Sequence, residues 1–127
     1  MVSFSLSTGQ STCWTDITDL VRSAVRELGI TDGVITVFVP HTTAGITINE
    51  NADPDVVRDM VSVLDRLVPR EGPYRHAEGN SAAHVKASLL GSSVNVIVEG
   101  SALRLGTWQG IYFCEFDGPR RRTVMVR

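Results

Sequence analysis

Residues 34–39 (VITVFV) are the stretch that most constrains the fold of this chain. Five of the six are β-branched, and such residues lose side-chain freedom in a helix but pack well on a sheet. A short, nearly continuous apolar run of this kind is typical of a buried central strand. Pro40 cannot donate to a strand ladder, so the strand is expected to end there and to present His41 and the following threonines to solvent.

Seven further segments have the pattern of strands. In residues 2–8, apolar and polar side chains alternate with a period of two, as in a half-buried strand. The apolar set in residues 107–116 changes parity after Trp108, which predicts a bulge near Gly110. The turn at 117–120 is expected to join the last two strands as a hairpin. The predicted strands are residues 2–8, 13–17, 34–39, 46–50, 94–99, 103–105, 107–116 and 123–126.

Apolar residues spaced by three and four predict amphipathic helices at 20–28 and 54–67. A short third helix is predicted at 82–90 from the capping residues before it and Gly91 after it. Thr18 or Asp19, Asp53, and Asn80 or Ser81 are the expected N-caps. The second helix has a stripe that is expected to be buried: Val57, Met60, Val61, Leu64 and Leu67. The predicted fold is α+β, with seven to eight mostly antiparallel strands in a two-sheet sandwich-like arrangement and three helices, in a single domain spanning residues 1–127.

Charge and apolar patterning exclude two classes of partner. Twelve basic against fourteen acidic side chains give a net charge of −2, which provides no field for a nucleic-acid backbone. The run of three arginines at 120–122 favours a solvated strand edge. No apolar run approaches the roughly 20 residues of a membrane span. Cys13 and Cys114 form no metal or redox motif, and free buried thiols are expected. A cytoplasmic protein is predicted.

The chain contains three histidines, His41, His76 and His84, each among small or hydrogen-bonding residues. Three converging imidazoles could hold a metal ion with an open coordination position, or bind and protonate an anionic substrate. The alternative is that each histidine is a separate surface or partly buried structural residue. His84 falls in the first turn of the third helix, where unpaired backbone N–H groups favour an anion such as phosphate.

Four segments, PHTTAGITINE (40–50), HAEGNSAAH (76–84), LRLGTWQ (103–109) and EFDGPR (115–120), together resemble the small trimeric proteins called secondary thiamine-phosphate synthases. The resemblance implies a β-sandwich-like α+β fold and a homotrimer with sites at subunit boundaries. It also implies a weak synthase activity that joins an aminopyrimidine methyl diphosphate to a thiazole phosphate and releases pyrophosphate. A small phosphorylated molecule is then the expected partner.

These motifs supply the candidate site residues. The resemblance implies that the three histidines bind a divalent metal, zinc or magnesium, or the phosphate, and that Arg120 clamps phosphate oxygens. Trp108 is expected in the core rather than stacked on a substrate ring. The candidate catalytic residues are His41, His76, His84, Glu50 and Glu115. The candidate substrate- or phosphate-binding residues are Thr42, Thr43, Asn49, Gly79, Asn80, Gln109 and Arg120.

Two other functions remain open from the sequence. The same ligands and an open position would suffice for metal-assisted hydrolysis of a phosphate ester. The histidines could instead hold a small anion or a metal ion in a module without turnover.

Overall fold

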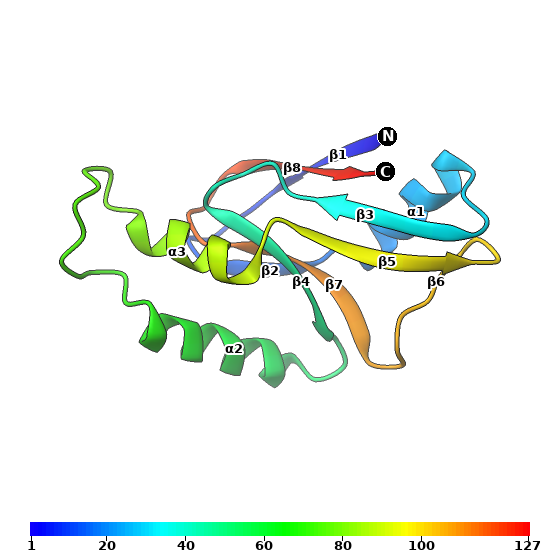
Figure 1. The fold of residues 1–127 in the computed structure, drawn as a ribbon. Helices are drawn as coiled ribbons and strands as arrows, with labels where there is room; N and C mark the ends of the chain where they lie inside the picture. The colour runs from blue at the N-terminus through cyan, green and yellow to red at the C-terminus, as the bar shows by residue number, and fades with distance from the viewer.

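A computed structural model describes residues 1–127 and confirms the predicted α+β class, with eight strands and three helices in two sheets (Figure 1). In chain order the elements are β1 (Val2–Ser7), β2 (Cys13–Asp16), α1 (Thr18–Leu28), β3 (Gly33–Phe38), β4 (Ala44–Glu50), α2 (Pro54–Leu67), α3 (Ser81–Leu90), β5 (Ser93–Glu99), β6 (Ala102–Leu103), β7 (Gln109–Glu115) and β8 (Arg121–Val126).

The two sheets are both antiparallel. The larger sheet has the strand order β1-β8-β3-β5-β6, and the smaller one the order β2-β7-β4. In β3, Val37 pairs with Val94 of β5 on one side and with Val126 of β8 on the other, which confirms a central strand at this position. The strand is buried on one face only, with Val34 63% exposed, so the prediction of a strand buried throughout is wrong. All the strand pairs in the two sheets are antiparallel, as the alternating patterns indicated.

The main core lies between the two sheets. Ile35 and Val37 from the larger sheet meet Ile46 and Phe113 from the smaller one, and all four side chains are fully buried. Helix α1 adds its inner face to this core through residues such as Val21. Full burial of one such side chain contributes about 1.5–3 kcal/mol, so this contact between the sheets is the main source of stability.

Strand β7 is buried on both faces. Ile111 and Phe113 face the main core, whereas Tyr112, Cys114 and Phe116 form a second cluster with the small residues of α3. The β4–β7 register runs without interruption from Ala44 opposite Glu115 to Glu50 opposite Gln109, so the predicted bulge near Gly110 is wrong. Apolar residues occur at both odd and even positions of this segment because each face of β7 packs against a different hydrophobic cluster.

Helix α3 packs closely on β4, and the closest approach is at the C-terminal end of the helix. A Cβ atom at Gly45 would lie 3.0 Å from the carbonyl oxygen of Gly91 and 3.3 Å from Cβ of Leu90. Only a residue without a side chain leaves room for this approach. The smaller sheet is therefore enclosed between the larger sheet and the α2–α3 layer (Figure 1).

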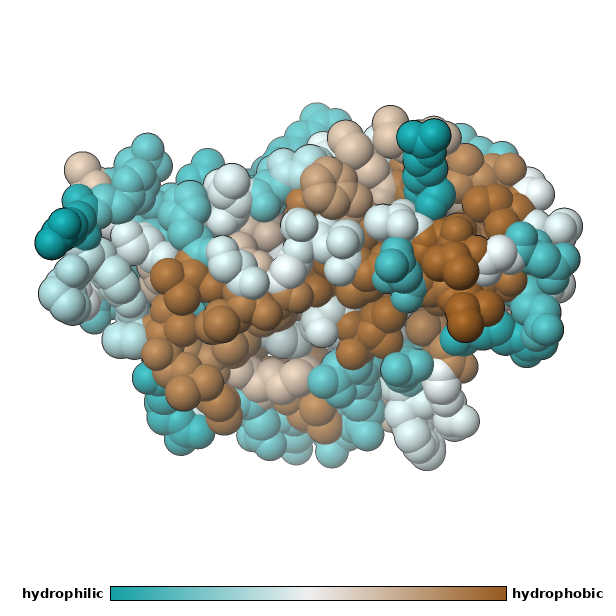
Figure 2. Space-filling model, viewed as in Figure 1, coloured by the Kyte–Doolittle hydropathy of each residue, from teal (hydrophilic) through white to brown (hydrophobic).

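Helix α2 differs from its prediction. It begins as expected, with Asp53 Oδ1 accepting a hydrogen bond from the backbone N–H of Asp55, but none of its residues is buried. Val57 and Leu64 only pack against the edge of the second cluster, and Leu67 is 69% exposed. Figure 2 shows the resulting hydrophobic area over α2 and α3. The apolar stripe is real, but the chain itself does not cover it.

The segment between β7 and β8 was also predicted wrongly. These strands belong to different sheets, so residues 117–120 carry the chain from one sheet to the other instead of closing a hairpin.

Trp108, predicted in the core, is 62% exposed. Cys13 and Cys114 are free thiols, and burial raises the pKa of the Cys114 thiol. None of the three helices combines the length and apolar composition needed to cross a bilayer.

Candidate functional site

A polar cavity of about 460 Å³ brings the three histidines together. It is formed by the loop after β3, the loop before α3, the first turn of α3 and the β7–β8 crossing. We call it the histidine pocket, and apart from Pro40 every residue lining it has a polar side chain. The lining residues are Pro40, His41, Thr42, Thr43, His76, Glu78, Asn80, His84, Asp117, Arg120 and Arg122.

His76 and His84 form a pair in this pocket. Their ring centroids are 5.5 Å apart and the rings meet edge to face at 86°. His76 comes from the loop before α3, and its side chain is 47% exposed, with Nε2 3.8 Å from a carboxylate oxygen of Glu78. His84 comes from the first turn of α3. Two imidazoles from different segments thus face one solvent-accessible cavity.

The N-terminus of α3 opens onto this pair without a side-chain cap. Asn80 occupies the N-cap position, but its side chain makes no capping hydrogen bond. Its Nδ2 donates instead to Oδ2 of Asp117, at 3.0 Å. The prediction that an Asn80 or Ser81 side chain caps this helix is therefore wrong. The first backbone N–H groups of α3 are left without a helix partner, which favours a negative charge nearby.

Asp117 is held as a carboxylate by its neighbours. Burial alone would raise the pKa of Asp117, but hydrogen bonds from Asn80 and Arg120 outweigh it and lower that pKa. Arg120 contributes two contacts to this residue, since its Nε donates to the Asp117 carbonyl at 2.8 Å and its Nη2 to Oδ2 at 3.0 Å. A guanidinium has five N–H donors, so three remain for a ligand.

His41 has a structural role. Its Nε2 accepts a hydrogen bond from the backbone N–H of Thr123 at 2.9 Å. Strand β3 pairs with β8 only at Val126 and Met125, so the imidazole provides a partner for β8 beyond the end of that ladder. Burial lowers the pKa of His41, and the neighbouring Arg122 guanidinium lowers it further. His41 therefore stands in the pocket as a neutral ring.

The three histidines are not arranged as a set of metal ligands within this chain. The structure contains no group of three or more histidine, cysteine, aspartate or glutamate side chains arranged to hold a metal ion. One nitrogen of His41 is already engaged with Thr123, so the expected ligand set of His41, His76 and His84 does not fit a metal here. A bound zinc or magnesium ion stays a prediction from the sequence.

We expect His41 to make folding stability depend on pH. In the unfolded chain this histidine binds a proton near its ordinary pKa of 6.5, whereas the folded chain binds it only at lower pH. The unfolded state then binds more protons in that window, so stability present above pH 6.5 is lost as the pH falls through the folded pKa.

The measurement compares the free energy of unfolding of the wild type and His41→Gln between pH 5 and 8. The glutamine side chain keeps an acceptor for the backbone of Thr123 but does not titrate. The advantage of the wild type should shrink below pH 6.5. Parallel curves for the two proteins would contradict a neutral His41.

Glu115 and Arg122 form a buried ion pair behind the pocket. Glu115 is fully buried and Arg122 is 5% exposed, with Arg122 Nε donating to Glu115 Oε2 at 2.7 Å. Burial would raise the pKa of Glu115, but hydrogen bonds from Arg122, the Asp117 backbone and Thr8 lower it. Arg122 Nη2 also donates to the Thr43 hydroxyl at 2.8 Å. The pair holds the wall of the pocket, and Glu115 has no exposed surface for proton transfer.

Arg122 was missed as a site residue. The run of three arginines favoured a solvated strand edge, and this interpretation is wrong for Arg122. In β8, Arg122 lies on the same face as Val124 and Val126, both of which are fully buried. The alternation of side chains along a strand could therefore have identified it.

Three predicted site residues lie elsewhere. Glu50 and Gln109 pair at the end of the β4–β7 ladder opposite to the pocket, and seven strand residues span roughly 20 Å. The Asn49 side chain donates to the sulfur of Met60 at 3.3 Å. Gln109 Oε1 accepts from the backbone of Gly106 at 2.8 Å. Thr43 lines the pocket but is buried, with its hydroxyl accepting from Arg122, and Gly79 lines a neighbouring cavity.

Comparison with known proteins gives a consistent relationship. A family model described as UPF0047 protein YjbQ-like matches residues 2–127. The UPF0047 protein YugU of Bacillus subtilis is 58% identical over 113 residues, which cover 88% of this chain and 86% of the relative. The UPF0047 protein MJ1081 of Methanocaldococcus jannaschii is 53% identical over 112 residues, covering 88% and 81%.

A crystal structure of an uncharacterised conserved protein of the YjbQ/UPF0047 family from Clostridium acetobutylicum superposes with a TM-score of 0.98 at 59% identity, covering 100% of this chain and 98% of that one. None of these descriptions names an activity or a ligand. The resemblance to secondary thiamine-phosphate synthases is therefore wrong, and so is the predicted synthase function. The two alternatives, metal-assisted ester hydrolysis and a module without turnover, gain no support from these relatives.

Proposed function

The chain belongs to the YjbQ-like UPF0047 family, and we propose that its histidine pocket binds a small anionic, phosphorylated molecule with which His76 and His84 exchange protons. The observation that carries this proposal is the edge-to-face pair of accessible imidazoles at the uncapped end of α3. The polar lining of the pocket supports a hydrophilic ligand rather than an apolar one.

The histidines decide the charge of the pocket. Its two guanidiniums, Arg120 and Arg122, are matched by two carboxylates, Glu78 and Asp117, and Arg122 is further neutralised by Glu115 behind the wall. Positive charge in excess of this balance can come only from protonated imidazole. We therefore expect anion affinity to increase as the histidines take up protons, with the free N–H groups of α3 and Arg120 as additional donors.

Two neighbouring imidazoles can also serve as acid and base within one reaction. One ring donates a proton to a ligand oxygen while the other accepts one, which is the usual role of histidine in general acid–base catalysis. His41 is excluded from this role because its Nε2 is engaged with the backbone of Thr123. The proton chemistry is therefore assigned to His76 and His84 alone.

Inorganic phosphate is the simplest probe of binding. A hydrogen bond to a charged group contributes about 1.5–3 kcal/mol, so His76→Asn and His84→Asn should each weaken phosphate binding by about tenfold or more. Titration calorimetry at pH 6 and pH 8 measures this, with tighter binding by the wild type expected at pH 6. Arg121→Met, an exposed change on the outer face of β8, is the control and should bind like the wild type. Equal affinity in all four proteins would remove the pocket as a phosphate site.

The proton-exchange half of the proposal needs a separate readout. The protein is incubated in D₂O with a panel of phosphorylated metabolites, and NMR follows deuterium incorporation and new products. We expect at least one compound to change with the wild type and to stay unchanged with His76→Asn or His84→Asn. Binding of phosphate without any such change across a broad panel would leave a binding site and contradict a catalytic one.

We also propose an oligomeric state and a cellular location for this protein. The exposed apolar side chains of α2 and α3, among them Val63, Leu67, Val85 and Leu89, support association of copies into the homotrimer expected from the sequence. A cytoplasmic location is consistent with the absence of a membrane-spanning helix.

A further inference from the structure

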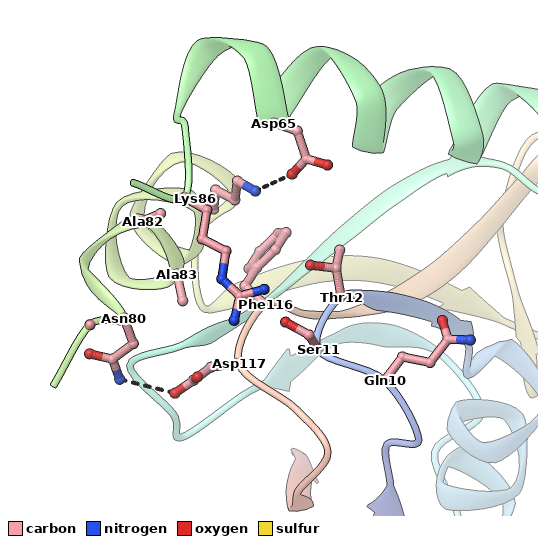
Figure 3. A pocket seen from close by; sticks show the side chains of 12 residues that line it. Gln10, Ser11, Thr12, Asp65, Asn80, Ala82, Ala83, Lys86, Phe116 and Asp117 are labelled. Carbon is pink, nitrogen blue, oxygen red and sulfur yellow. Dashed lines mark hydrogen bonds and ion pairs between the residues drawn. The ribbon is translucent and has the colours of Figure 1, made fainter. Parts of the chain in front are cut away.

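A second cavity, of about 490 Å³, shares Asn80 and Asp117 with the histidine pocket (Figure 3). Lys86 of α3, Asp65 of α2, and Ser11 and Thr12 from the loop between β1 and β2 also line it. We call it the lysine cavity. Because two residues line both cavities, the cavities are neighbours, and the hydrogen-bonded pair Asn80 and Asp117 lies between them.

Lys86 is the unusual group of this cavity. The residue is 6% exposed, and within the chain its ammonium donates only to Asp65. Figure 3 shows Lys86 reaching toward Asp65 near the ring of Phe116, whose centroid is 5.9 Å from Nζ. An ammonium has three N–H donors, so two remain open beside the cavity. A buried charge with unfilled donors is costly unless water or a ligand completes them.

Asn80 and two hydroxyl residues complete the polar lining of the cavity. Its Nδ2 donates to Asp117, but its Oδ1 is buried without any hydrogen-bond partner in the chain. The hydroxyls of Ser11 and Thr12 add groups that both donate and accept. The lysine cavity therefore combines the open donors of Lys86 with hydroxyls that donate and accept, whereas Asn80 Oδ1 is itself covered.

The charge of the cavity limits what it can take. Two carboxylates, Asp65 and Asp117, balance two cations, Arg70 and Lys86, so a second anionic group gains little. Only three of its twelve lining residues are hydrophobic, which disfavours an apolar group. Hydroxyl groups suit such a surface, because each can accept from Lys86 and donate to a carboxylate.

We infer that the lysine cavity binds the uncharged, hydroxylated part of the molecule whose phosphate lies in the histidine pocket. The substrate class is then a phosphorylated polyol or sugar. This inference rests on the proposed function, because it takes the histidine pocket as the phosphate site. The shared residues Asn80 and Asp117 lie where the two parts of the ligand join.

Glucose 6-phosphate and inorganic phosphate are the two probes, compared by calorimetry on the full chain. The wild type should bind the sugar phosphate at least about tenfold more tightly than phosphate. Lys86→Met, which keeps the length of the side chain, should abolish this difference and leave phosphate affinity unchanged. His84→Asn should weaken both ligands together. Thr12→Val is a milder second variant for the case in which Lys86→Met does not fold. It should weaken binding of the sugar phosphate and leave phosphate affinity unchanged.

The outcomes separate this inference from the function on which it rests. Sugar phosphate binding no more tightly than phosphate, or an equal loss of both ligands in Lys86→Met, would overturn the lysine cavity and leave the phosphate site in place. If neither ligand binds the wild type, both proposals fall.

Discussion

Arg122→Met should lower the free energy of unfolding by about 3–5 kcal/mol. The substitution leaves the carboxylate of Glu115 fully buried without its cation, and the remaining hydrogen bonds from Thr8 and the backbone of Phe116 and Asp117 cannot neutralise it. A loss of this size is a large fraction of the stability of a small domain. The Thr43 hydroxyl loses its donor at the same time, so the pocket wall is expected to loosen.

Denaturant unfolding at neutral pH measures this loss against a matched control. Arg121→Met makes the same chemical change one residue away on the exposed face of β8 and should shift stability by no more than about 0.5 kcal/mol. The double variant Glu115→Gln/Arg122→Met has neither buried charge, whereas each single variant leaves one buried charge without its partner. The double variant should therefore lose clearly less than the sum of the two single losses. A similar small effect of Arg121→Met and Arg122→Met would show that the ion pair does not hold the pocket.

Gly118→Ala is expected to cost about 3 kcal/mol or more, because the new methyl group has no space. Its Cβ would collide with the carbonyl oxygen of Gln10, and it would lie 2.8 Å from the Thr8 hydroxyl and 3.0 Å from Cγ of Glu115. The first of these contacts is with backbone, which cannot move aside as a flexible side chain can. The crossing between the sheets would have to shift, and with it Asp117 and Arg120.

Gly9→Ala is the control for this substitution. A Cβ at Gly9 meets nothing within 4 Å, and the residue needs no left-handed backbone. Thermal unfolding should place Gly9→Ala close to the wild type and Gly118→Ala well below it. Equal melting temperatures for the two variants would mean that the crossing at Gly118 is not tightly packed.

The elements of this fold were largely predictable because burial follows the side-chain period. The run at 34–39 identified the central strand β3, and alternation identified β1, β4 and β5. The wrong predictions share one cause. The spacing of apolar residues shows which side chains favour burial, but it does not show which element packs on them. The parity change in β7 was interpreted as a bulge, and the stripe of α2 as buried, because sequence does not show which second layer is present or absent.

The site was predictable only in part. His41, His76 and His84 do line one pocket, as their positions at the ends of elements suggested. Glu50 and Gln109 were assigned to the site through neighbouring motif residues, but a strand of seven residues carries them to its far end. Arg122 and Lys86 drew no attention because charged residues are usually exposed, and their burial depends on ion pairs with residues of other elements, Glu115 and Asp65.

The most direct test of the proposed function is NMR of the three imidazole rings during a phosphate titration at pH 6.5. We predict that resonances of His76 and His84 shift together and saturate at one affinity, with ¹⁵N shifts moving toward the protonated form. Those of His41 should remain those of a neutral ring. Shifts confined to His41, or no saturable shift in His76 and His84, would contradict a phosphate site that works through this histidine pair.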